Sequence, residues 1–255
     1  MKFIVNGAKG RMGTQIVAQL NSENCPHELL AGVDISASEG DGYFTKLADI
    51  SEKSDCIIDF SHHSAVPSLL DFAVERKIPT VVATTGHTED ELKKINDAAK
   101  KIPVFFSANM SLGVALLVEL AKNAASAMPE AEIEIIEKHH DRKLDAPSGT
   151  ALMLANAICE VRPEAYANVG RSGHGKRAKE EIGIHAVRMG NVVGEHEVIL
   201  ATDNQTITIK HEAHSRALFA EGAIAAAAFL VSAEIGLHDM KSIISGVKKS
   251  AAIAR

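Results

Sequence analysis

The groups best suited to chemistry in this chain lie between residues 137 and 151. The segment EKHHDRKLDAPSGTA places His139, His140 and Lys143 among other charged residues, between a strand-like run and a helical pattern. Histidine can donate a proton near neutral pH, and fixed positive charge beside it attracts an anion. We therefore expect a site for an anionic substrate that must be protonated.

A helix start closes this segment. Ser148 precedes Gly149 and Thr150, and apolar residues then recur at helical spacing. The first N–H groups of a helix lack partners within it and can bind an anion. The alternative is a solvated basic loop in which Ser148 is an ordinary N-cap. The density of polar groups between two ordered elements favours a site.

A second candidate site lies near the N-terminus. Residues 3–7 form an apolar strand, and the glycine-rich turn 7–13 leads into a helix. The Gly-x-x-Gly-x-x-Gly spacing is not the commoner dinucleotide-binding one. However, Asp34 ends the next strand, 29–33, where an acid can accept hydrogen bonds from an adenosine ribose. A dinucleotide site is a better interpretation than a turn without a ligand.

Strands and helices alternate through the first 110 residues. Further strands are expected at 56–61, 80–86 and 103–107, and helices at 65–76 and 88–101. Such alternation predicts a Rossmann-like, doubly wound parallel sheet, with ligands at the carboxyl ends of its strands. The polar or glycine-rich turns at those ends are 7–13, Asp34, Ser61-His62, Thr84-Thr85 and 108–110.

The pattern changes after residue 110. A long apolar helix is expected at 111–128, and the basic, glycine-rich stretch 170–177 is either an anion-attracting lid or a solvated loop. Three antiparallel strands are expected, at 182–189, 196–201 and 205–211. Strands without intervening helices indicate a smaller α+β domain.

Two helices should complete the chain. The first, 219–233, is alanine-rich and apolar on all sides, which predicts that it is buried, and a shorter one is expected at 240–247. The α/β chain is thus divided into a dinucleotide-binding domain, 1–110 with 218–255, and a substrate-binding and oligomerisation domain, 111–217.

Composition excludes several classes of partner. The 255 residues are 46% hydrophobic and carry a net charge of -6 without a basic block, so no nucleic-acid partner is expected. No run approaches the roughly 20 apolar residues of a membrane span, and the opening strand leaves no room for a signal peptide. Three scattered cysteines fit a reducing cytoplasm. No metal site is predicted, because the run 211–214, His-Glu-Ala-His, is one residue short of a zincin motif.

The run from Glu137 to Ala151 resembles the substrate loop of the 4-hydroxy-tetrahydrodipicolinate reductase (dihydrodipicolinate reductase) family, Glu-x-His-His-x-x-Lys-x-Asp-Ala-Pro-Ser-Gly-Thr-Ala. Other blocks that resemble the family are 7–13, 59–61, 84–86, 108–114, 182–188 and 194–197. The resemblance implies an enzyme that reduces the cyclic dicarboxylate made from aspartate semialdehyde and pyruvate. Its product, tetrahydrodipicolinate, lies on the route to diaminopimelate and lysine.

The resemblance also implies residue roles. His139 would be the acid/base group, and Lys143 a second proton donor and carboxylate partner. The other substrate residues would be His140, Ser148, Gly149 and Thr150. The cofactor residues would be Gly7, Ala8, Lys9, Gly10, Arg11, Met12, Gly13, Asp34, Ala83, Thr84, Thr85, Ser107, Ala108, Asn109 and Met110. Departures from the family pattern, which bear on the nicotinamide contacts, are Ala83 and His62.

Family members are typically homotetramers joined through the sheet of the second domain, here residues 182–211. They often accept both NADH and NADPH. Asp34 would repel the 2′-phosphate of NADPH, whereas Lys9 and Arg11 could reach it, so we expect both cofactors with NADH favoured. Two alternatives are a dinucleotide sensor without turnover and another amino-acid dehydrogenase on the same plan. A sensor would have no reason to keep His139, Lys143 and the helix start together.

Overall fold

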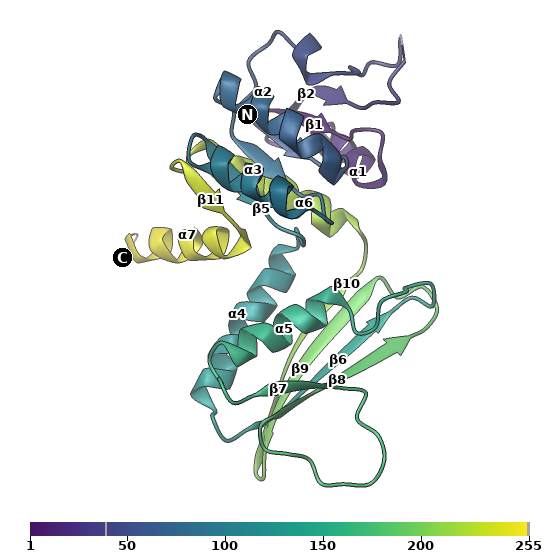
Figure 1. The fold of residues 1–255 in the computed structure, drawn as a ribbon, viewed down its shortest axis with the longest axis vertical. Coiled ribbons are helices and arrows are strands. Elements are labelled where there is room, and N and C mark those ends of the chain that lie inside the picture. The colour runs from purple at the N-terminus through teal and green to yellow at the C-terminus, as the bar shows by residue number, and fades with distance from the viewer. Residues whose placement is uncertain (39, 254–255) are drawn as a thin grey trace. The chain divides into compact units, whose positions relative to one another are not determined.

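The chain divides into two units, each with its own sheet and core (Figure 1). The computed structural model describes residues 1–38 and 40–253. One unit is 1–111 with 217–255 and the other is 112–216. The domain bounds expected from the sequence differ from these by one residue at each boundary, and residues 254–255 of that expectation lie outside the described residues.

Six strands form the sheet of the first unit, in the order β11-β5-β4-β3-β1-β2. They are β1 Lys2–Asn6, β2 Glu28–Val33, β3 Cys56–Asp59, β4 Thr80–Val82, β5 Pro103–Phe106 and β11 Gly236–His238. All neighbours pair in parallel, which confirms the predicted doubly wound sheet, although β11 was not predicted. The connections reverse direction between β1 and β3, and such a switch point is where ligands bind.

Helices flank this sheet. They are α1 Arg11–Leu20, α2 Val66–Arg76, α3 Glu89–Ala99, α6 Ala217–Val231 and α7 Met240–Ile253, with short 3-10 turns at Leu47–Asp49 and His63–Ala65. As predicted from its apolar surface, α6 is largely buried, against α1 and β3–β5. At Gly222 it approaches the chain so closely that a Cβ would lie 1.7 Å from the Met110 carbonyl oxygen. None of the helices in the described part of the chain is both long and apolar enough to span a membrane.

The second unit has a mixed sheet in the order β10-β9-β6-β8-β7. Its elements are α4 Leu112–Ala127, β6 Glu132–His139, α5 Gly149–Cys159, β7 Tyr166–Val169, β8 Glu181–Arg188, β9 Gly194–Thr202 and β10 Gln205–Ala213. Alternation along β6 directs Ile133 and Ile135 into one core with buried residues of α4 and α5.

The strand pairing corrects one expectation. β9 and β10 are antiparallel neighbours as predicted, but β8 does not pair with β9, because β6 lies between them. β8 pairs with β6 in parallel. After β6 the chain passes through the helix α5 and returns as β7, which pairs with β8 in parallel on the side away from β6.

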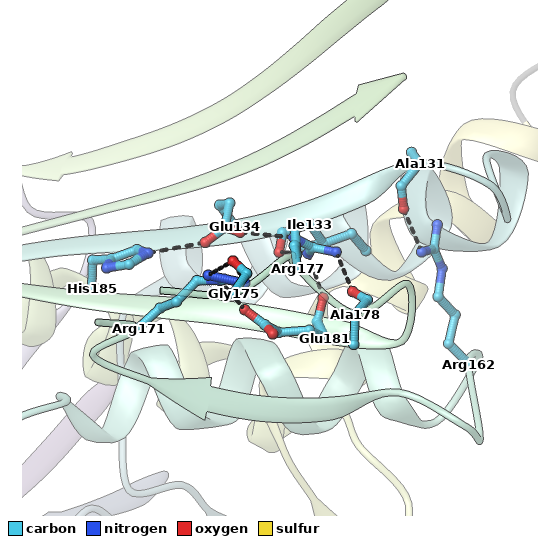
Figure 2. Close-up of polar contacts among 10 residues, drawn as sticks. All are labelled: Ala131, Ile133, Glu134, Arg162, Arg171, Gly175, Arg177, Ala178, Glu181 and His185. Carbon is cyan, nitrogen blue, oxygen red and sulfur yellow. Dashed lines mark hydrogen bonds and ion pairs between the residues drawn. The ribbon is translucent and has the colours of Figure 1, made fainter. Parts of the chain in front are cut away.

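The basic stretch 170–177 connects β7 to β8 and is attached to the sheet by its two arginines (Figure 2). Arg171 Nε lies 3.0 Å from Glu181 Oε1. Arg177 Nε lies 3.1 Å from Glu134 Oε1, and its Nη2 donates to the Ile133 carbonyl at 2.8 Å. These guanidinium groups therefore neutralise carboxylates of their own unit.

The contact at Gly222 leads to a stability prediction. Gly222→Ala should lower the free energy of unfolding by about 1–3 kcal/mol, because the added methyl overpacks α6 against Met110. The matched control is Gly246→Ala on α7, whose Cβ would lie 3.7 Å from Phe229 Cε2, an ordinary contact. It should raise stability by about 0.5–1 kcal/mol, since alanine favours helix. Urea unfolding measures both, and two changes of the same sign would contradict this packing.

Candidate active site

The glycine turn between β1 and α1 has room for no side chain at its key positions. Gly7 has a φ of +77°, and a Cβ there would lie 2.7 Å from the Phe60 carbonyl oxygen. A Cβ on Gly13 would lie 2.0 Å from the Gly7 oxygen. Gly10 is the N-cap of α1, so no side chain of the N-cap residue binds the first N–H groups of this helix. The turn thus brings backbone N–H groups at a helix start to the sheet edge, which suits a dinucleotide pyrophosphate.

Asp34 follows β2 directly and holds a negative charge beside this turn. Its Oδ1 accepts hydrogen bonds from Ser36 N and Oγ at 2.9 and 2.7 Å, and its Oδ2 accepts one from Lys9 N at 3.0 Å. Burial alone would raise the pKa of Asp34, but these hydrogen bonds outweigh it and lower the pKa. The Lys9 ammonium reaches past Asp34, to Asp41 Oδ2 at 2.9 Å. An ionised carboxylate at this strand end is placed to accept hydrogen bonds from an adenosine ribose.

A pocket of about 310 Å³ lies beyond Asp34. Its apolar lining includes Ile35, Leu47, Ala65 and Phe72. This apolar pocket next to Asp34 has a lining that suits an adenine base. Sequence reasoning missed this pocket because its walls come from a 3-10 turn and from α2, which are brought together only by the tertiary fold.

The remaining predicted cofactor residues follow β4 and β5. These strands are parallel neighbours, so Ala83–Thr85 and Ser107–Met110 emerge at the same edge of the sheet. Thr84 is buried, and its Oγ1 lies 3.1 Å from His87 Nε2. Ser107 Oγ donates to the Asn109 carbonyl at 2.8 Å. The structure therefore brings every predicted cofactor residue into the first unit, at or next to the carboxyl ends of its strands.

In the second unit, His139 is the last residue of β6 and belongs to the buried face of that strand. The sequence had suggested that His139 lies on the loop after this strand, which is wrong. Its Nδ1 is 2.6 Å from Oε2 of Glu137, two residues earlier on the same face. An ionised carboxylate only accepts hydrogen bonds, so His139 donates through Nδ1–H. The other nitrogen, Nε2, faces Gly194, where a Cβ would lie 3.1 Å away.

Glu137 is fully buried and has three hydrogen-bond partners. Arg188 Nη1 and Nη2 donate to its two oxygens at 2.8 and 2.7 Å, and Ser148 N donates to Oε1 at 2.9 Å. Burial would raise the pKa of Glu137, but the hydrogen bonds from Arg188, His139 and Ser148 outweigh it and lower the pKa. Burial is also the main reason that the pKa of His139 is lowered, and Glu137 opposes that shift.

His196 on β9 packs its ring against His139, with centroids 5.2 Å apart and an interplanar angle of 72°. Its Nε2 lies 2.9 Å from Ser148 Oγ, and this hydroxyl oxygen accepts a hydrogen bond from Ala151 N at 3.2 Å. Ser148 is therefore the N-cap of α5, and its hydroxyl is engaged inside the protein. Burial, followed by the charge of His139, lowers the pKa of His196 to about 4.

The loop between β6 and α5 carries the other predicted substrate residues. Lys143 Nζ lies 2.8 Å from Asp145 Oδ1, and Lys143 N donates to the His140 carbonyl at 3.2 Å. Gly149 and Thr150 begin α5. Sequence reasoning gave no role to Glu137, Arg188 or His196. Arg188 and His196 fell on predicted strands, whereas Glu137 was placed in the polar segment that follows a strand-like run and in fact lies within β6. The strand pairing that brings these residues to His139 has no local signal.

Comparisons with known proteins agree along nearly the whole chain. A family model described as dihydrodipicolinate reductase, N-terminus, matches residues 1–110, and one described as dihydrodipicolinate reductase, C-terminus, matches 113–244. The 4-hydroxy-tetrahydrodipicolinate reductase of Caldanaerobacter subterraneus subsp. tengcongensis is 48% identical, covering 96% of this chain and 98% of the relative. The enzyme of the same name from Clostridium tetani is 41% identical, covering 96% and 97%.

A solved structure is similar as well. It is a dihydrodipicolinate reductase from Paenisporosarcina sp. TG-14 with dipicolinate bound, at 27% sequence identity and a TM-score of 0.79. The similarity covers 94% of this chain and 97% of that one. The likeness therefore includes both units.

The lowered pKa of His196 predicts how stability depends on pH. In the unfolded chain its pKa returns to the ordinary value of 6.5, so acid protonates the unfolded form first and favours unfolding. Between pH 6.5 and 4 this group should remove about 3 kcal/mol of unfolding free energy. His196→Gln can still bond Ser148 but does not titrate, so urea unfolding across this window should show a shallower loss. Equal losses in both proteins would contradict the prediction.

Proposed function

The chain belongs to the dihydrodipicolinate reductase family, and we propose that it performs the family's reaction with the residues described above. It reduces 4-hydroxy-tetrahydrodipicolinate to tetrahydrodipicolinate in lysine and diaminopimelate biosynthesis, with a nicotinamide cofactor. The observation that carries the assignment of residues is the buried contact between His139 and Glu137, in the same unit as the helix start at Gly149.

His139 is the acid in this proposal. A reduced nicotinamide, when bound, supplies the hydride to a ring carbon conjugated to an imine, and the resulting enamine needs a proton. Because His139 Nδ1 is engaged by Glu137, the proton would be delivered from Nε2. Lys143 would serve as a second proton donor and as a cation for a substrate carboxylate. The motive for that role is its place four residues after His139, on the loop that follows β6.

The substrate carboxylates need donors, and α5 offers them. The Ser148 amide is committed to Glu137, so we assign the amides of Gly149 and Thr150 to a substrate carboxylate. Hydrogen bonds to a charged group contribute roughly 1.5–3 kcal/mol each. His140, half-buried next to His139, would be a further carboxylate ligand.

For the cofactor, we propose that the amides at the start of α1 hold the pyrophosphate and that Asp34 accepts hydrogen bonds from the adenosine ribose. The Lys9 ammonium, placed past Asp34, would partly offset the repulsion between Asp34 and a 2′-phosphate. However, Asp41 already pairs with Lys9 and weakens that effect. We therefore propose that both cofactors are used, with NADH favoured.

We also propose a homotetramer that forms through the sheet of the second unit. Both helices of that unit pack on one face of the sheet. The opposite face carries partly exposed residues such as Ile136 and Ile199. A cytoplasmic location is proposed on the basis of Cys25, Cys56 and Cys159, which are free thiols.

The test of the proposed function is the His139→Gln variant. Its kcat should fall by about 10²–10⁴-fold, the usual contribution of a positioned acid or base. NADH oxidation is followed with aspartate semialdehyde, pyruvate and the preceding synthase. His238→Gln, in the first unit and bonded to the Glu234 carbonyl, is the control and should keep wild-type activity. A His139→Gln enzyme within threefold of wild type would remove His139 from this role.

Cofactor choice gives a second test. Lys9→Ala should lower kcat/KM for NADPH more than for NADH, because only NADPH carries the 2′-phosphate. The half-exposed ammonium is screened by salt, so the difference should shrink at high ionic strength. Steady-state rates with both cofactors at low and high salt measure it. A clear preference of the wild type for NADPH at every ionic strength would show that Asp34 does not bind the ribose.

A further inference from the structure

We propose that Glu137 is a positioning residue that holds both the His139 imidazole and the start of α5 in place for the reaction. The proposal rests on the acid role of His139 proposed above. Glu137 is fully buried, so it acts through its neighbours and not on the substrate. Glu137 opens the run 137–151, but the sequence of this run does not show that its side chain is buried.

The geometry divides the two carboxylate oxygens between two tasks. Oε2 accepts from His139 Nδ1 at 2.6 Å, which fixes the ring orientation and leaves Nε2 for proton transfer. Oε1 accepts from the Ser148 amide at 2.9 Å, at the N-cap of the helix that would bind the substrate carboxylate. One rigid group therefore sets the positions of the acid and of the carboxylate donors relative to each other.

Arg188 holds this carboxylate itself in place. Its two terminal nitrogens bind both Glu137 oxygens, in the bidentate geometry that fixes orientation as well as charge. Arg188 Nη2 also donates to the Asp145 carbonyl at 2.6 Å, on the loop that carries Lys143. The network thus joins β6, β8, the loop and the start of α5.

The charges that face His139 come from four places. They are Glu137 on β6, Arg188 on β8, His196 on β9 and Lys143 on the loop. Burial and the two cations disfavour a protonated imidazole, and Glu137 favours it. Loss of the Glu137 charge should therefore make His139 a stronger acid that is protonated only at lower pH.

The experiment compares Glu137→Gln with wild type across pH. The variant keeps the side-chain shape, but it loses the charge and a dependable acceptor for Nδ1–H. We expect kcat to fall by up to about 10⁴-fold, the loss seen when a buried carboxylate that orients a catalytic imidazole is replaced by its amide. The alkaline limb of the kcat profile should move to lower pH, and KM for the dicarboxylate should rise. In ¹⁵N-histidine NMR, the His139 signal should change its tautomer pattern.

Glu134→Gln is the matched control. Glu134 lies on the same strand but on the opposite face, and it too pairs with an arginine and a histidine, Arg177 and His185 (Figure 2). A merely structural role of Glu137 predicts lower stability of Glu137→Gln with an unmoved pH profile and an unchanged His139 tautomer. The positioning role predicts that only Glu137→Gln moves the alkaline limb and the His139 tautomer.

Two further variants separate the possible outcomes. If Glu137→Gln does not fold, Glu137→Asp retains the charge beside Arg188 with a side chain one methylene too short for His139. It should lose kcat, and full activity in Glu137→Asp would overturn the inference.

His139→Gln tests the underlying assignment. If His139→Gln is inactive while Glu137→Gln keeps the wild-type pH profile and tautomer, the positioning role is wrong and the acid role stands. An active His139→Gln enzyme would refute the acid role.

Discussion

The second unit depends on one buried charge. Glu137 is fully buried, and leaving such a carboxylate without its partner would destabilise the fold by about 3–5 kcal/mol. The partners that prevent this lie on different elements, Arg188 at the end of β8 and Ser148 before α5. The pairing of β6 with β8 sets His139 opposite Arg188, so a one-residue slip would move the guanidinium to the other face. The need to neutralise Glu137 therefore favours a single register and, with it, one geometry for the polar cluster.

The first unit depends on a constraint of space. Gly7 and Gly13 let the turn after β1 pack against its neighbours where any Cβ would collide with backbone. Because the sheet is parallel, the carboxyl ends of its strands lie at one edge, and Asp34 and Thr84 are brought to that edge with the turn. The first unit thus positions backbone groups through steric exclusion. The second positions side chains through a charge network.

This difference explains what could be predicted from the sequence. The glycine turn and Asp34 were found because their constraints are local and leave a fixed spacing. The parallel sheet followed from the alternation of strands and helices. The partnership of Glu137 with Arg188 was missed because it depends on strand neighbours 51 positions apart, and periodicity does not report these. For the same reason β8 was wrongly expected to pair with β9. The neighbour that they share is β6, from which α5 and β7 separate them in the chain.

The charge balance around His139 has a consequence for the reaction. In the free protein, burial and the cations Lys143 and Arg188 keep the pKa of this histidine low, against the opposing effect of Glu137. A dicarboxylate bound at Lys143 and the start of α5 would add negative charge beside the same ring, and nearby negative charge raises the pKa of a histidine. On the proposed role of His139, the substrate itself would then promote protonation of its acid. In the free protein Glu137 does not outweigh burial and the two cations, so the proton would be held most firmly when the substrate is present.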